Sequence, residues 1–127
     1  MDVRPPLSYR WLRANGIRRL TPWHFVEERE GKGASAQFAK EDPDGRSVYT
    51  FAYRQDCDDF AGFTIINGQA TDQVICYHPT FCGSPNTLMI DGTYPDIWAF
   101  LREVVIPDTA SWLTDESDIE DLEHPKA

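Results

Sequence analysis

The sequence predicts an α+β domain, and three observations support that prediction. The chain has 127 residues, which corresponds to one domain. Hydrophobic residues make up 41% and aromatic residues 13%, so a chain that is disordered over most of its length is excluded. One helical segment, several strand segments and further helical segments follow one another in that order. We therefore expect a single antiparallel sheet of about four to six strands, flanked by N-terminal and C-terminal helices.

The first forty residues are expected to hold one short helix and one extended entry into the core. Ser8 can cap a helix that runs to Ala14. Residues 20–25 then enter the core as an extended segment, because the proline within them restricts the residue before it. The polar stretch 27–33 indicates a loop or a weak helical turn, and residues 37–40 a short strand.

The middle of the chain carries the strand signals. Tyr49, Phe51 and Tyr53 alternate with smaller residues, so these three aromatics are expected to share a core face. Residues 60–66 are apolar on both faces, which indicates a central strand. The strands are expected over residues 48–54, 60–66 and 73–77, with an edge strand at 88–90.

The last third is expected to be helical and then irregular. Apolar residues at helical spacing from Ile97 to Val105 predict a helix that Pro107 breaks, and Asp108 can cap a second short one. The acidic residues 115–127 are expected to form a mobile tail beyond a domain that spans 1–114. We expect three of the four tryptophans to be mostly buried; they are Trp11, Trp23, Trp98 and Trp112.

Charge is distributed unevenly along the chain, whose net charge is −9. Residues 1–19 hold five arginines and one aspartate, a balance of +4, and residues 115–127 hold six acids and one lysine, a balance of −5. An acidic protein repels phosphate backbones, so no nucleic-acid partner is expected, whereas a basic protein would be attracted. No apolar run is long enough to cross a membrane, and no secretory signal is recognised. The odd cysteine count favours a reducing cytoplasm.

Three carboxylates, Asp56, Asp58 and Asp59, fall within four residues between two expected strands. Hard metal ions take several oxygen ligands, but this spacing does not match an EF-hand loop. In such a turn, aspartates can instead accept backbone N–H bonds, with Arg54 as the counter-charge. The third interpretation is a negatively charged recognition loop for a protein partner.

Histidine and cysteine residues offer a weaker basis for catalysis. Cys57, Cys76 or Cys82 could pair with His78 in a Cys–His dyad, but no motif around them marks a nucleophile. Neither a phosphate-binding glycine loop nor a basic stacking platform occurs. We therefore expect no enzyme activity, no metal and no cofactor. His24 is expected to mark the end of an element, and His124 to lie in the tail.

Four ordered segments together resemble the SUKH superfamily, the Smi/Knr-like group of bacterial immunity proteins and fungal cell-wall regulators. They are LTPWHF at residues 20–25, FAYRQDCDDFAGF at 51–63, VICYH at 74–78 and YPDIWAFL at 94–101, and the resemblance covers residues 11–113. It implies a curved antiparallel sheet flanked by helices, and a binding module that is not an enzyme. Many bacterial members neutralise a cognate toxin, which is often a nuclease.

The expected function is therefore that of a cytoplasmic immunity protein, a monomer or weak dimer, which binds a basic toxin domain. A regulatory or scaffold domain of the same family is the first alternative. A small hydrolase or metal-dependent enzyme that uses the three aspartates and His78 is the second. The expected partner-binding residues form two acidic patches: Asp56, Asp58 and Asp59 in the first, and Glu27, Glu28 and Glu30 in the second.

Overall fold

A computed structural model describes residues 3–81 and 86–124, and it confirms the α+β fold class. Its sheet is open, and all neighbouring strands are antiparallel and follow one another in chain order. The strands are β1 (Arg19–Leu20), β2 (Trp23–Phe25), β3 (Ser47–Arg54), β4 (Phe60–Ile66), β5 (Gln69–His78) and β6 (Met89–Tyr94).

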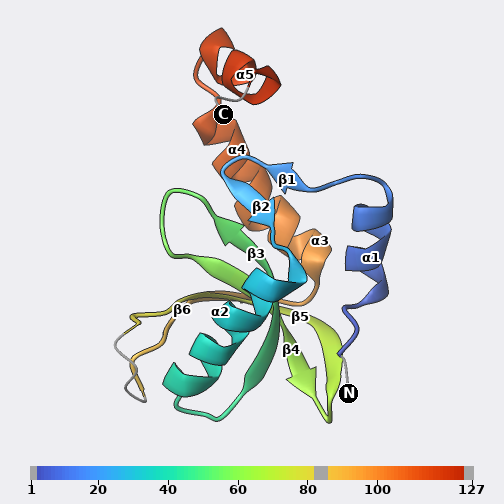
Figure 1. Cartoon of the computed structure of the whole chain (residues 1–127), viewed down its shortest axis with the longest axis vertical. Helices are drawn as coiled ribbons and strands as arrows, with labels where there is room; N and C mark the ends of the chain where they lie inside the picture. Colours follow the sequence, from blue (N-terminus) through green and yellow to red (C-terminus); the bar gives the residue numbers. More distant parts are fainter. Residues whose placement is uncertain (1–2, 82–85, 125–127) are drawn as a thin grey trace.

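Helices lie on both faces of this sheet (Figure 1). They are α1 (Leu7–Ala14), α2 (Glu28–Glu41), α3 (Ile97–Phe100), α4 (Ile106–Trp112) and α5 (Glu116–Glu123), with the π-helical turn η1 (Leu101–Val105) between α3 and α4. The helices α1 and α3 cover one face through Tyr9 and Phe100, which pack on Phe51 of β3. Helix α2 covers the other face through Phe38, which packs on Tyr77 of β5.

Helix α2 begins within the stretch 27–33, expected as a loop or a weak helical turn, and it covers the short strand expected at 37–40. The predictions of a loop and of a strand were wrong, and the helical turn is part of a helix of 14 residues. Its buried residues recur at helical spacing, but two of the first ones, Gly31 and Ala34, are small and give little apolar signal. The absence of a side chain at Gly31 lets the helix approach the sheet. A Cβ there would lie 2.6 Å from the backbone oxygen of Thr50.

The helix at the end of the domain does not stop at Pro107. Helical backbone continues from α3 through η1 into α4, and Pro107 lies in the first turn of α4. The π turn before the proline shifts the backbone ladder from i−4 to i−5 partners, and a proline in the first turn has no N–H to satisfy. The second short helix predicted after Asp108 is therefore part of one continuous rod.

The acidic segment also has regular structure, since α5 begins at an Asp115 capping box. Its mobility stays a prediction.

The expected burial of three tryptophans was wrong, because only Trp23 is buried, at 3% exposure. Trp11 and Trp98 are 64% and 44% exposed, and Trp112 is half-buried. In α1 it is Tyr9 that enters the core, so Trp11, which is two residues away, points outward.

The shared aromatic face predicted for β3 is also interrupted. A bulge between Thr50 and Ala52 puts Phe51 and Ala52 into the same core, while Tyr53 stacks on His24 instead.

Candidate functional site

The first acidic patch lies in the turn that joins β3 to β4. Asp56 and Asp58 are exposed and Asp59 is half-buried, so the three carboxylates stand at one end of the sheet. Among the described residues, Asp58 makes no hydrogen bond or ion pair, whereas Asp56 and Asp59 each have a partner. The turn therefore presents one free carboxylate between two that are held in place.

Arg54 links this turn to α4. Its Nε donates to Asp56 Oδ1 at 2.7 Å, and its Nη1 donates to Asp108 Oδ2 at 3.2 Å. The indole Nε1 of Trp23 donates to the same Asp108 oxygen at 2.8 Å. The expected counter-charge role of Arg54 is therefore present. Asp108 was expected only as a helix cap, and its neighbours in sequence do not reveal that it reaches this site.

A second link joins the turn to the ends of β5 and β6. His78 Nδ1 lies 2.9 Å from Asp59 Oδ1. Burial raises the pKa of Asp91 on β6 to about 6, and the charge of Asp59 and a hydrogen bond with it act in the same direction. The charge of His78 lowers this pKa. Two carboxylates and an imidazole thus share one end of the sheet. Asp91 was not a candidate from the sequence, because only strand pairing brings it to Asp59.

The cysteines do not supply a nucleophile to this cluster. Cys76 is buried, and burial raises the pKa of its thiol, which disfavours the reactive thiolate. Burial also raises the pKa of Cys57. Cys82 lies outside the described residues. Within the part of the chain that the structure describes, no group of three or more His, Cys, Asp or Glu side chains is placed to hold a metal ion.

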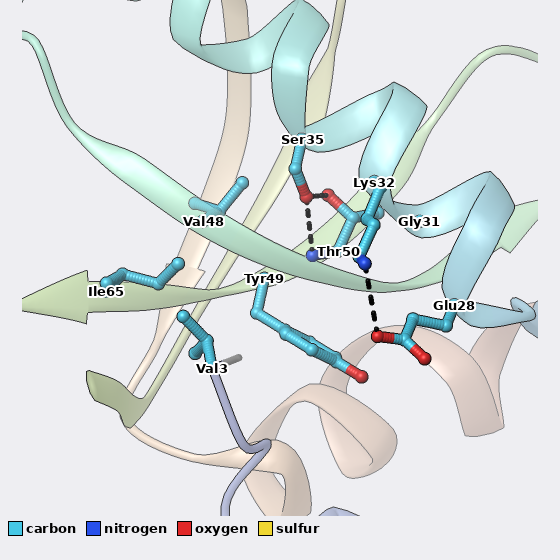
Figure 2. Close-up of a pocket in the computed structure, with 9 residues that line it drawn as sticks. All are labelled: Val3, Glu28, Gly31, Lys32, Ser35, Val48, Tyr49, Thr50 and Ile65. Atoms are coloured by element: carbon cyan, nitrogen blue, oxygen red, sulfur yellow. Dashed lines mark hydrogen bonds and ion pairs between the residues drawn. The ribbon is translucent and has the colours of Figure 1, made fainter. Parts of the chain in front are cut away.

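The second acidic patch, Glu27, Glu28 and Glu30, lies at the start of α2 and does not join the first. Figure 2 shows Glu28 and Lys32 at the mouth of a groove between α2 and β3, where they form an ion pair of 3.4 Å. The groove has a volume of about 290 Å³. Helix α2 crosses β3 near Thr50, which is about 13 Å from Arg54 along an extended strand.

Basic residues surround this second patch. Arg10 and Arg13 of α1 line a shallow depression together with Glu27 and Glu28. Opposite charges this close lower the net field that a distant partner meets. The β3–β4 turn is therefore the stronger candidate for binding a basic protein.

Comparison of the chain with protein-family models, with curated proteins and with solved structures gives no match. None of the helices in the described ranges, 3–81 and 86–124, is long and apolar enough to cross a membrane.

Proposed function

We propose that this chain is an immunity protein that binds and neutralises a basic toxin domain, and that the β3–β4 turn is its principal contact. The observation that carries the proposal is the exposed Asp58, held between Asp56 and Asp59 on a turn that Arg54 and His78 fix in place. A fixed turn loses little conformational entropy on binding, which favours affinity.

The charge of the chain supports the same proposal. A nuclease needs a basic surface to hold phosphates, and a protein with a net charge of −9 is attracted to such a surface. Electrostatic steering raises the association rate, which benefits a protein that must neutralise an incoming toxin quickly. The sequence resemblance to the SUKH superfamily supports this proposal and also its alternative, a scaffold domain for an endogenous partner.

The three aspartates do not have equal roles in this proposal. Asp59 pairs with His78, and Asp56 pairs with Arg54, so a reversal of charge at either position also disturbs the turn. Asp58 is exposed and has no partner among the described residues, so a substitution there changes recognition and leaves the fold intact.

The test is to co-purify the tagged protein with the C-terminal domain encoded by the gene immediately upstream, and to measure the affinity at two salt concentrations. We expect Asp58→Lys to weaken binding by about 2 kcal/mol or more, roughly thirty-fold, mostly through loss of charge complementarity. Higher salt should weaken the wild-type complex.

Asp72→Lys is the matched control. Asp72 is an exposed aspartate on β5, and it lies near the β4–β5 turn at the opposite end of the sheet. It should bind as the wild type does, and both variants should keep the wild-type unfolding temperature. Equal affinity of the Asp58 variant and the wild type would contradict the proposed contact. Failure of the upstream product to bind would favour the scaffold function.

A further inference from the structure

A second exposed surface lies beside the candidate site, and nothing in the proposed function uses it. A groove of about 710 Å³ runs between the β1–β2 hairpin and the helices α4 and α5. Apolar side chains from both walls line it: Leu20 from β1, Trp112 and Leu113 at the end of α4, and Ile119 and Leu122 from α5. Leu113 is 57% exposed and Ile119 is 45% exposed. The groove therefore offers solvent-accessible apolar side chains among polar ones.

Helix α5 gives one wall of this groove a strong negative charge. It holds five acids and no base, and two of them, Asp118 and Asp121, line the groove beside Ile119 and Leu122. No residue of α5 is buried, and Figure 1 shows that it projects from the end of the molecule. A helix this short and this exposed gains little stability from its own sequence, so a contact along its apolar side would stabilise it.

The chain also carries a surface of the opposite charge. Leu7 and Trp11 are four residues apart on α1, so they lie on one face of that helix, and they are 71% and 64% exposed. Arg10 of the same helix is exposed, and so are Arg4 and Arg18, which precede and follow the helix in the chain. Tyr9 holds the opposite face of α1 against the sheet. The outer face of α1 is therefore a rigid, basic and apolar ridge.

We propose that the groove binds helix α1 of a second copy of this chain. Leu7 and Trp11 of one copy contact the apolar floor, and the arginines beside them face the acids of α5. A chain cannot place its own α1 there, because α1 is fixed to the sheet and lies away from α5 in Figure 1. Each copy has one ridge and one groove, so a two-fold arrangement uses both surfaces twice and closes as a dimer.

The charge pattern determines how the ridge is oriented. Arg19 and His24 line the wall of the groove that faces α5, so this wall is not acidic. The arginines of the incoming helix therefore point toward α5, and its apolar side chains contact Leu20 and Leu113. Because the attraction is between exposed charges, the dimer should dissociate more readily as the salt concentration rises.

The test measures the mass of the full chain in solution by sedimentation, with no other protein present. We expect a concentration-dependent dimer, and we expect Trp11→Glu and Ile119→Glu each to weaken it at least about ten-fold. Both side chains are exposed, so each variant should still unfold cooperatively as a folded domain. Trp98→Glu and Ile66→Glu are the matched controls, since these exposed residues belong to neither surface and should leave the dimer intact.

Mixing the two weakened variants distinguishes a contact between ridge and groove from a contact between two identical surfaces. The Trp11→Glu chain keeps its groove and the Ile119→Glu chain keeps its ridge, so the mixture regains one of the two contacts and associates more tightly than either variant alone. If either substitution left the dimer unchanged, the proposal would be overturned. The dimer would then join two α1 ridges, or two grooves, instead of a ridge and a groove. A wild-type chain that stays monomeric up to about 1 mM would also overturn it.

Two further outcomes would count against the proposal. Growth into assemblies larger than two would overturn the two-fold closure. Association of the groove with an added basic protein, but not with a second copy, would give the groove a different occupant. None of these measurements involves the toxin, so the immunity proposal and this one can fail separately.

Discussion

Glu41 is a buried carboxylate that accepts hydrogen bonds from Thr80, Phe81 and Thr87, which lie between β5 and β6, and its replacement by glutamine should destabilise the fold. Its side chain accepts five hydrogen bonds from residues within the described ranges. Oε1 accepts from Thr80 N, Thr80 Oγ1 and Thr87 Oγ1 at 2.7, 2.9 and 3.0 Å. Oε2 accepts from Gln37 Nε2 at 2.6 Å and from Phe81 N at 3.1 Å. The residue has no exposed surface.

The size of the effect follows from these contacts. In Glu41→Gln an NH₂ group replaces Oε2 and meets the two donors that Oε2 accepted from, Gln37 Nε2 and Phe81 N. Gln37 can rotate its amide and accept a bond instead. The N–H of Phe81 then loses its acceptor, which costs about 1 kcal/mol, and the three bonds to the remaining oxygen lose the added strength of a charged acceptor. We expect a loss of about 3 kcal/mol in the free energy of unfolding, which lowers Tm by roughly 10 °C in a chain of this size.

The loss should also depend on pH. Burial alone would raise the pKa of Glu41, but the hydrogen bonds from Gln37, Thr80 and Thr87 lower it from 4.5 to about 2. A pKa that is lower in the folded state stabilises the fold above pH 4.5, and this contribution disappears as the pH falls toward 2. The difference between the wild type and the variant should therefore be full at pH 7 and should shrink below pH 4.5.

Urea and thermal unfolding followed by circular dichroism at pH 7 and at pH 3 would measure both effects. Glu103→Gln, at an exposed glutamate of η1, removes the same charge and should change the free energy of unfolding by less than about 0.5 kcal/mol. Equal stability of the Glu41 variant and the wild type at pH 7 would refute the assigned role. So would a difference that stays constant down to pH 3.

Three further predictions concern the core, the helix contact and the acidic cluster. Phe51→Ala should cost about 3–5 kcal/mol in urea unfolding, because this fully buried ring lies between α1, α3 and β4; a loss below about 1 kcal/mol would contradict that packing. Gly31→Ala should destabilise by about 1–3 kcal/mol, since its Cβ would press on the Thr50 carbonyl; unchanged stability would show that α2 can shift away. Asp91 should titrate near pH 6 by carbon-detected NMR, and Asp59→Asn should lower that pKa by removing a neighbouring negative charge; an unchanged value would leave burial as the only cause.

The success of the sequence-based predictions depended on how local each signal was. The strand 60–66 was predicted with the bounds of β4, because its apolar, β-favouring residues lie together between two turn segments. Helix α2 was missed, since its contact with the sheet uses Gly31 and Ala34, which add almost nothing to an apolar pattern. Only Phe38 in its later turns gave a strong signal, and one residue does not define a period.

The candidate site shows the same division. Asp56, Asp58 and Asp59 are neighbours in the chain, so the sequence alone places them in one turn and gives that turn its charge. Asp91 and Asp108 join them only because β6 pairs with β5, and because the rod of α3, η1 and α4 returns to Trp23 and Arg54. No spacing rule links residues from such distant segments.

The sequence by itself therefore determined the α+β class, the principal strands, the acidic turn and the opposite charges of the two ends, since composition and short-range periodicity encode all of these. The tertiary structure alone decided how α2 packs on the sheet and which carboxylates surround Arg54 and His78. It also decided that Leu7 and Trp11 on α1, and Ile119 on α5, stay exposed. Those outcomes depend on which faces meet when the sheet pairs and the helices pack, and that is a property of contacts between distant residues.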